Sequence, residues 1–334
     1  MSMRDHRVAP KAKPNTQIPI RGSARNAGPR PVIPDNFPIS QVVDTIVTWY
    51  RGHARPLPWR RPGIDAYGVL VCEVMSQQTP IARVLPKWHT WMERWPTPAH
   101  LAHAPLADIL TVWQGLGYPR RARNLQRAAQ AIVEKHNGTV PCDPKELESL
   151  PGVGTYTAGA VAAFAYGERT PVIDTNVRRT LARLVGGVAL PGAATRRIDR
   201  ERAVAMLPAE AETAARWSAA IMEFGALVCT SRAPLCEDCP VAWTCRWLQA
   251  GAPAGAEAAR PRQKWNGTDR QLRGRVMALL CDHAERGILS VSFDTVAQAA
   301  LDSADDTRRA IRIVNSLAHD GLVCIDGDRV ALPG

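Results

Sequence analysis

The stretch LPGVGTYTAGAVAAFAYG, residues 150–167, contains the strongest local folding signal in the chain. Pro151 and Gly152 end a helix that precedes them, and Gly154 permits a tight turn of the backbone. Thr155 is a residue type that caps the start of a following helix. The stretch therefore predicts two helices joined by a short hairpin.

A capping-box pattern lies just upstream of this hairpin. Asp143 is followed three residues later by Glu146, which predicts the start of a short helix. The backbone N–H groups of the hairpin then point outward at a helix N-terminus, where they can bind a phosphate without a charged side chain. An ordinary turn between two packed helices is the alternative interpretation of the same residues.

The composition indicates a polyanionic partner. The 334 residues include 42 Lys and Arg against 31 Asp and Glu, which gives a net charge of +11. Nucleic acid is the common partner of such a protein. No run approaches the 18 apolar residues of a membrane span, and the N-terminus has no apolar segment typical of a secretory signal. We expect a cytoplasmic protein that contacts no membrane.

Four of the eight cysteines lie in one short segment, CTSRAPLCEDCPVAWTC, residues 229–245. Their spacing is C-x6-C-x2-C-x5-C, and they are Cys229, Cys236, Cys239 and Cys245. A chain with 46% hydrophobic residues can bury a core without disulfides, so the four read as metal ligands in a reducing compartment. Spacing alone leaves open an iron–sulfur cluster, which it favours, or a structural zinc ion.

Composition and the positions of Pro and Gly divide the chain into four parts. Residues 1–36 form a basic tail expected to be disordered, and residues 37–248 read as successive helices without convincing strands. A small-residue linker covers 249–265. Residues 266–334 form a smaller unit.

The smaller unit has a pattern of three helices closed by a hairpin. Helical periodicity is found around 270–285, 292–302 and 306–319, and Asp326-Gly327 lies between two short apolar segments. The fold class predicted is therefore an all-α core followed by a winged-helix-like α+β unit.

Asp174 lies in the segment VIDTNVRRTLARL, residues 172–184, at the expected start of a helix. A structural N-cap is the common role of such an aspartate, although the positive end of a helix also keeps a carboxylate ionised. The order of hairpin, V-I-D-T-N-V segment and four-cysteine loop resembles the helix–hairpin–helix base-excision DNA glycosylases, the superfamily of endonuclease III and MutY. The resemblance spans about residues 40–248.

This resemblance implies a two-lobed helical fold with an aspartate, here Asp174, in the cleft. It also implies a [4Fe–4S] cluster held by the four clustered cysteines. Lyase members carry a nucleophilic lysine in the hairpin, where this chain has Tyr156. By that resemblance Tyr156 is also a candidate catalytic residue. None of the chain's six lysines lies in either cleft motif, so we expect a monofunctional glycosylase.

Glu73 lies in the segment YGVLVCEVMSQQTP, residues 67–80, at the edge of an apolar stripe. A glutamate that is simply exposed on the helix surface would lie at the same place in the sequence pattern, so this is the alternative interpretation. The segment resembles the SEVMLQQT signature of MutY-type adenine glycosylases, in which the glutamate is the catalytic acid. The resemblance implies that Glu73 protonates the departing adenine and that ionised Asp174 stabilises the cationic sugar.

Two further segments resemble the same family: LPWR at 57–60 and GLGYPRRARNL at 115–125. The resemblance implies that Tyr118 and Gln78 wedge into the base stack while the target base swings out. The remaining DNA contacts are expected from the hairpin and from the arginine-rich turn. These residues are Gly152, Gly154, Thr155 and Arg120.

The chain also departs from the MutY pattern. Ser76 replaces a leucine, Cys72 a serine and Thr175 a glycine. The C-terminal unit resembles that of short, actinobacterial-type members and not the usual Nudix-like domain that inspects 8-oxoguanine. The resemblance implies a bacterial cytoplasmic enzyme associated with the nucleoid.

Three functions stay open at this point. The first is a monomeric adenine glycosylase acting on adenine opposite 8-oxoguanine or guanine in double-stranded DNA. The second is a monofunctional T/G or U/G mismatch glycosylase, in which Glu73 would be expendable. The third is a non-enzymatic iron–sulfur DNA-binding regulator.

Overall fold

The structure is a computed structural model that describes residues 32–254, 266–301 and 307–334. Most of the expected disordered tail (1–31) and linker (255–265) lies outside the described residues. Residues 32–334 form one compact unit. The proposed boundaries of the core and the C-terminal unit therefore stay a prediction.

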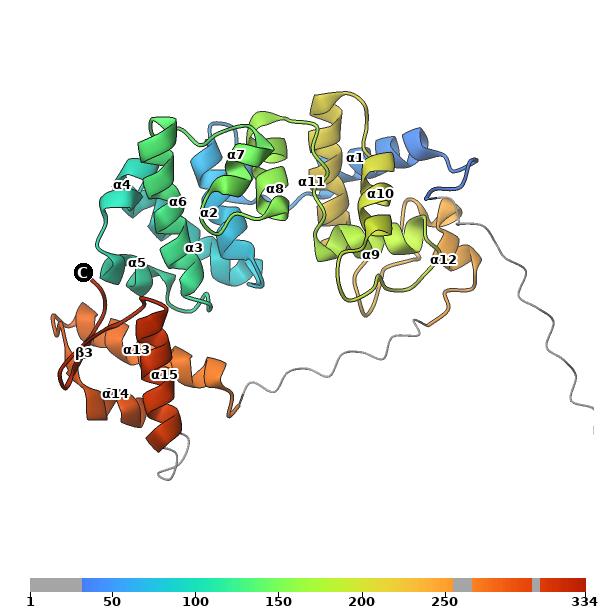
Figure 1. The fold of residues 1–334 in the computed structure, drawn as a ribbon. Coiled ribbons are helices and arrows are strands. Elements are labelled where there is room, and N and C mark those ends of the chain that lie inside the picture. The colour runs from blue at the N-terminus through green and yellow to red at the C-terminus, as the bar shows by residue number, and fades with distance from the viewer. Residues whose placement is uncertain (1–31, 255–265, 302–306) are drawn as a thin grey trace, which may run out of the picture. The chain divides into compact units, whose positions relative to one another are not determined.

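Two groups of helices form the core, which confirms the all-helical, two-lobed expectation (Figure 1). The first lobe contains α2 (Ala66–Ser76), α3 (Ile81–Arg94), α4 (Pro98–His103), α5 (Leu106–Trp113), α6 (Arg120–His136), α7 (Pro144–Ser149) and α8 (Thr155–Tyr166). The second contains α1 (Ile39–His53), α9 (Thr175–Leu184), α10 (Arg197–Ala205), α11 (Ala211–Leu227) and α12 (Arg246–Gln249). Two 3₁₀ turns, η1 (Pro58–Arg60) and η2 (Ala242–Thr244), complete the core.

Helix α2 is the central element of the first lobe. Every residue from Tyr67 to Met75 is buried, including Glu73. The sequence had placed Glu73 at the edge of one apolar stripe, but this helix is apolar on all sides because neighbours surround it. Asp65 begins the helix by accepting a hydrogen bond from the N–H of Gly68 at 2.9 Å.

The predicted helix–hairpin–helix is present as α7 and α8. Asp143 caps α7 by accepting hydrogen bonds from the N–H groups of Lys145 and Glu146 at 2.7 and 3.1 Å. The expected roles of two hairpin residues were wrong. Gly154, and not Thr155, is the N-cap of α8, and its φ of −103° needs no glycine. Thr155 is the first helical residue, so its side chain does not cap the helix.

The C-terminal unit has the topology of a winged helix, as predicted. Its helices are α13 (Asp269–Glu285), α14 (Phe293–Ala299) and α15 (Thr307–His319), and its strands are β1 (Val291–Ser292), β2 (Cys324–Asp326) and β3 (Arg329–Ala331). The antiparallel sheet has the order β1-β3-β2, with Val330 paired to both Val291 and Ile325. Strand β1 was missed because two residues show no periodicity.

The C-terminal unit packs on the first lobe. Apolar residues of α13, among them Leu272, Val276 and Leu280, belong to the same core cluster as Leu110 and Trp113 of α5. The last residues of the chain also reach α5, where the carbonyl of Pro333 accepts a hydrogen bond from the N–H of Ala107 at 3.0 Å. One continuous apolar core therefore holds the unit in place.

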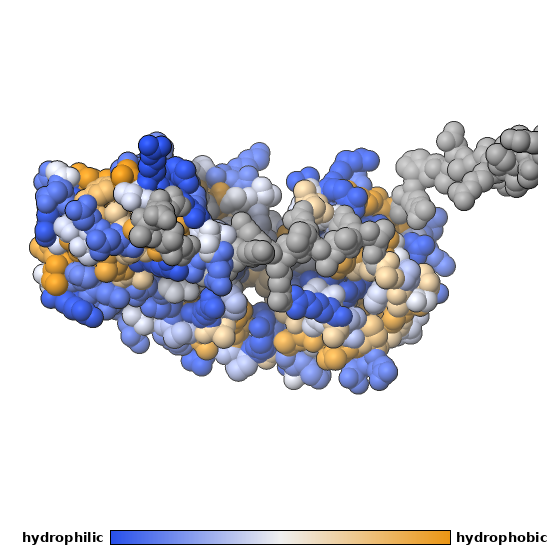
Figure 2. Space-filling view, turned by 90° about the horizontal axis from the view of Figure 1, so that it is seen from below, coloured by the Kyte–Doolittle hydropathy of each residue, from blue (hydrophilic) through white to orange (hydrophobic). Residues whose placement is uncertain are grey.

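The surface is mixed in character. Hydrophilic side chains cover much of the face shown in Figure 2, with smaller apolar patches between them. Among residues 32–254, 266–301 and 307–334, no helix is long and apolar enough to cross a membrane.

A glycine pair in the hairpin tests this account of the fold. Gly152 has a φ of +80°, and a Cβ there would lie 2.7 Å from the Cβ of Asn124. A Cβ at Gly154 would meet nothing within 4 Å. We predict that Gly152→Ala lowers the free energy of unfolding by about 1–3 kcal/mol, whereas Gly154→Ala changes it by less than about 0.5 kcal/mol. Chemical denaturation of both variants measures the difference, and equal losses would contradict the account.

Candidate active site

Glu73 and Tyr156 meet between the two lobes. The hydroxyl of Tyr156, in the first turn of α8, donates a hydrogen bond to Oε2 of Glu73 at 2.9 Å. The Glu73 side chain is only 7% exposed. Its pKa is about 7 in place of an ordinary 4.5, mainly because of burial, and the nearby negative charge of Asp174 acts in the same direction. The Tyr156 bond and the Arg60 guanidinium act in the opposite direction, since both favour the ionised carboxylate.

Tyr156 is a neutral donor in this arrangement. Burial raises the pKa of its hydroxyl well above its ordinary value, and the neighbouring carboxyls of Glu73 and Asp174 act in the same sense. The phenol therefore keeps its proton at neutral pH and holds the Glu73 carboxyl in one orientation. The sequence had identified Tyr156 as a candidate catalytic residue at the position of the lyase lysine, but it gave no sign of the bond to Glu73.

Asp174 is the N-cap of α9. Its Oδ1 accepts a hydrogen bond from the N–H of Val177 at 2.6 Å, and its Oδ2 accepts one from the side chain of Asn176 at 2.8 Å. Burial raises the pKa of this carboxyl, while the two donors lower it. The helix end thus stabilises the carboxylate, as the sequence suggested, but burial is the larger influence.

A cavity of about 310 Å³ opens beside Glu73. Its wall includes Trp59 and Arg60 from η1 and Met222 from α11, together with Glu73 itself. The volume lies at the lower end of the range for small-ligand pockets, roughly 300–1,000 Å³. Its lining combines apolar side chains with the charged groups of Glu73 and Arg60.

An ion-pair network supports this cavity. Glu223 on α11 is 1% exposed. Its carboxylate forms ion pairs with Nε of Arg55 at 2.7 Å and with Nη2 of Arg60 at 2.9 Å. Although burial opposes ionisation, the hydrogen bonds from the two arginines lower the pKa of Glu223 to about 2. The carboxylate thereby fixes Arg60 in the cavity wall.

Sequence reasoning missed Arg55 and Glu223. They are 168 positions apart, so no spacing connects them. The available signal was a single charge in the apolar stretch WSAAIMEFGAL, which predicts either a buried pair or a break in the helix.

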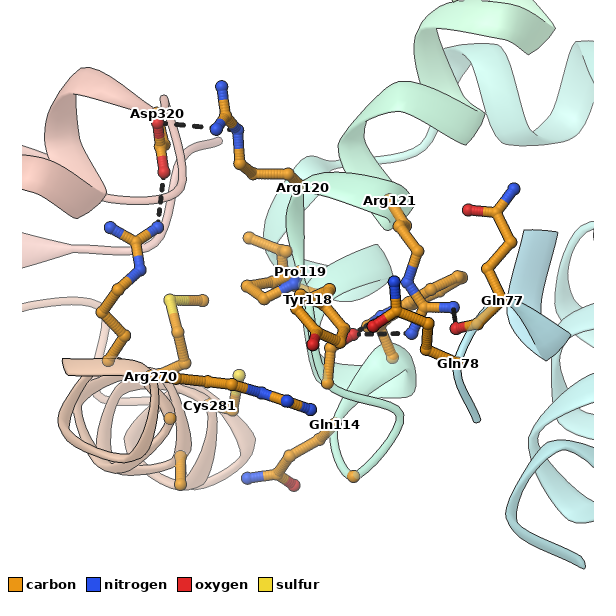
Figure 3. A pocket seen from close by; sticks show the side chains of 18 of the residues that line it. Gln77, Gln78, Gln114, Tyr118, Pro119, Arg120, Arg121, Arg270, Cys281 and Asp320 are labelled. Carbon is orange, nitrogen blue, oxygen red and sulfur yellow. Dashed lines mark hydrogen bonds and ion pairs between the residues drawn. The ribbon is translucent and has the colours of Figure 1, made fainter. Parts of the chain in front are cut away.

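The two expected wedge residues share an uncommon backbone conformation. Gln78 has a φ of 55° and Tyr118 a φ of 50°, and both side chains are exposed. A left-handed conformation is costly for such residues and is concentrated at functional sites. Figure 3 shows the two side chains at one opening of about 730 Å³, beside Gln77.

Arg121 connects the two turns that carry the expected wedge residues, Gln78 and Tyr118. Its guanidinium donates hydrogen bonds to the carbonyls of Met75 and Gln77 on one side, at 3.1 and 2.7 Å. On the other side it donates to the carbonyls of Leu116 and Gly117, at 2.9 Å each. Burial lowers its pKa to about 10, so it is still charged at neutral pH. The sequence singled out the neighbouring Arg120 and missed this residue.

The residues expected to contact DNA are exposed, but one of them, Arg120, is paired with a carboxylate. Gly152, Gly154 and Thr155 are exposed at the hairpin, where the first N–H groups of α8 have no partner within the helix. Arg120 is 70% exposed and lies 3.6 Å from the carboxylate of Asp320, in the C-terminal unit. The positive charge of Arg120 is therefore partly neutralised by a carboxylate of the C-terminal unit.

The four clustered cysteines gather at the end of the second lobe. The pKa values of Cys236, Cys239 and Cys245 are all raised, mainly by burial and also by the neighbouring thiols of the same set, which include Cys229. In the part of the chain that the structure describes, no three His, Cys, Asp or Glu side chains are arranged to hold a single metal ion.

Two arginines of α9 anchor the cysteine loop. Arg179 donates to the carbonyl of Cys229 at 2.9 Å. Arg183 donates to the carbonyl of Thr230 at 2.6 Å, lies 3.5 Å from Sγ of Cys229, and stacks on Trp247. The helix that Asp174 caps is therefore also the support of the loop.

Comparisons with known proteins agree with this geometry. Residues 71–201 match the HhH-GPD superfamily of base excision DNA repair proteins. An adenine DNA glycosylase of Mycobacterium tuberculosis is 47% identical, covering 86% of this chain and 92% of that protein. A thermostable thymine-DNA glycosylase and an endonuclease III–DNA complex are each 25% identical, cover 64% of this chain and 97% and 96% of theirs, and have TM-scores of 0.58 and 0.55.

Fold and relatives together define a DNA glycosylase, a hydrolase of N-glycosyl bonds. The chain belongs to the HhH-GPD superfamily and, within it, to the adenine DNA glycosylases.

The Tyr156–Glu73 bond predicts a shift in pH dependence. If protonated Glu73 is the acid, single-turnover base excision declines as the pH rises through about 7. The Tyr156 bond favours the ionised carboxylate, so Tyr156→Phe raises the pKa of Glu73 and moves the decline to higher pH. Tyr166→Phe removes a hydroxyl from the other end of α8 and leaves the decline in place. A decline at unchanged or lower pH in Tyr156→Phe would contradict this role.

Proposed function

We propose that this enzyme releases adenine mispaired with 8-oxoguanine or guanine in double-stranded DNA, and that it does not cleave the DNA strand at the resulting abasic site. The observation that carries the proposal is Glu73, a buried carboxyl with a pKa of about 7 beside a cavity. Adenine is a poor leaving group as an anion, so the base needs a proton while its bond to the sugar breaks. A carboxyl that is half protonated near neutral pH matches this task.

Asp174 acts on the sugar. Loss of the base leaves positive charge on the deoxyribose, and a nearby carboxylate stabilises that charge. The hydrogen bonds from Val177 and Asn176 favour the ionised form of Asp174 against the effect of burial. Glu73 and Asp174 thus have different tasks because their surroundings differ: at Glu73 burial outweighs the hydrogen bond from Tyr156 and the pKa is about 7, whereas Asp174 accepts two donors at a helix end.

Tyr156 accounts for a monofunctional reaction. An amine nucleophile is needed to open the sugar and cleave the strand, and this position of the hairpin has a phenol. Its hydroxyl is engaged with Glu73, so its task is to orient the acid. Water completes the hydrolysis.

DNA contacts follow from the hairpin and the wedge turns. The exposed backbone at Gly152, Gly154 and Thr155 would bind a backbone phosphate, which sets register without reading sequence. Gln78 and Tyr118 would fill the base stack while the adenine rotates into the cavity beside Glu73. Arg121 would keep both wedges in position.

The cysteine loop is proposed to hold a [4Fe–4S] cluster. The donor set fits, because four thiols gather in one loop and Arg183 offers a positive charge to Cys229. Bound there, the cluster would tie the loop to α9 and contribute folding energy. Iron and inorganic sulfide in the purified protein, with visible absorbance, test the assignment; zinc alone would contradict it. We expect the enzyme to be a monomer.

A strand-cleavage assay tests the proposed reaction. Duplexes carrying 8-oxoguanine:A, G:A, T:G or U:G are incubated with enzyme and analysed with and without alkali. We predict breakage of the adenine strand only after alkali. Glu73→Gln should lower single-turnover excision by about 10²- to 10⁴-fold, because the proton donor is lost.

The matched control is Glu134→Gln, which neutralises an exposed carboxylate on α6 and should leave excision unchanged. Faster excision from the 8-oxoguanine duplex than from the G:A duplex would support reading of the lesion without a Nudix-like domain. Release of thymine or uracil that survives Glu73→Gln would replace the proposal with a mismatch glycosylase on pyrimidines.

A further inference from the structure

The C-terminal unit is not built as a separate DNA-binding domain. Residues 266–334 contain eight arginines, no lysine, and ten aspartates and glutamates. The tip of its β2–β3 hairpin carries Asp326 and Asp328, which repel phosphate. On α15, the helix that a helix-turn-helix protein places in the major groove, Arg309 and Arg312 are paired with Asp269.

The position of the C-terminal unit nevertheless places one of its arginines, Arg270, against the expected wedge residue Tyr118. Arg270, in the first turn of α13, lies with its guanidinium carbon 4.1 Å from the centre of the Tyr118 ring. Figure 3 shows Arg270 extending from α13 toward the turn that carries Tyr118 and Pro119. A guanidinium at this distance is stacked on the ring.

Several polar contacts fix α13 in this place. Asp320, at the end of α15, lies 2.5 Å from Nη2 of Arg273 and 3.6 Å from Arg120 of α6. Gln114 donates to Asp282 at 3.2 Å. Because these contacts come in addition to the shared apolar core, Arg270 has a defined position relative to Tyr118.

We propose that Arg270 extends the DNA-binding surface of the core by contacting a backbone phosphate next to the base step that Tyr118 enters. The inference depends on the proposed wedge role of Tyr118. Phosphates line every base step, with one for about every 3.4 Å of each strand along the helix axis, so a cation held beside the wedge has backbone phosphates as its nearest anionic partners. Stacking uses the face of a guanidinium, whereas its edge carries the N–H donors that bind phosphate.

The choice of phosphate over a base edge rests on the local charge. Four arginines line the opening against the single carboxylate of Asp320, which leaves the opening positive: Arg120, Arg121, Arg270 and Arg273. Local charge of this kind supports sequence-independent contacts, which are the larger share of protein–DNA hydrogen bonds. The C-terminal unit thus adds affinity at the wedge and not through its own helix-turn-helix.

Salt dependence of binding tests the proposal. Fluorescence anisotropy measures Kd between 50 and 200 mM salt for full-length protein in a Glu73→Gln background, on an 8-oxoguanine:A duplex and on a fully paired duplex. We expect Arg270→Ala to reduce the slope of log K against log salt by about 0.9 on both duplexes. Binding at 0.1 M salt should weaken by roughly five- to tenfold, which corresponds to one lost phosphate contact.

Two variants serve as controls. Arg270→Lys loses the stacking on Tyr118 but keeps the charge, so it should retain the slope, which depends on the number of neutralised phosphates. Arg308→Ala removes the same charge from an exposed position of α15, outside the opening, and should change neither Kd nor slope. An unchanged slope in Arg270→Ala, or an equal loss in Arg308→Ala, would overturn the proposal.

The paired duplex separates this inference from the proposed function. A phosphate contact carries no sequence information, so its loss appears whether or not the enzyme prefers 8-oxoguanine. A loss confined to the 8-oxoguanine duplex would instead indicate contact with a base and would also contradict the proposal.

Discussion

The arrangement of the site depends on one buried carboxyl. Helix α2 is apolar on every side, so Glu73 is removed from water and its pKa rises to about 7. The group that compensates for this burial is the hydroxyl of Tyr156, which begins the second helix of the hairpin. The helix whose N-terminus we propose to face a phosphate therefore also carries the donor to Glu73, and a shift of α8 would disturb both at once.

Helix α9 gives the second lobe a similar double role. Asp174 caps its first turn, while Arg179 and Arg183 on its later turns bind the cysteine loop. The loop is far from the cavity along the chain, yet it supports the helix whose start holds a carboxylate beside Glu73. Displacement of the loop would therefore be transmitted to the helix that begins at Asp174.

The sequence predicted those parts whose cause is local. Pro151 and Gly152 stop a helix wherever they occur, and Asp326-Gly327 forms a hairpin turn, so both motifs were found. The ion pairs of Glu223 with Arg55 and Arg60 were missed because they form only once α11 packs beside η1. Arg121 could not be told from its neighbours Arg120 and Arg123, since only the folded chain determines which arginine turns inward.

The pKa of Glu73 is the quantity on which the account depends most directly. Carbon NMR of protein labelled at glutamate side-chain carboxyls, with Glu73→Gln used to assign the signal, measures it as the pH is varied. The account predicts a titration near pH 7 for this one carboxyl. A titration near the ordinary value of 4.5 would show that Glu73 is ionised at neutral pH, and would contradict its role as the proton donor.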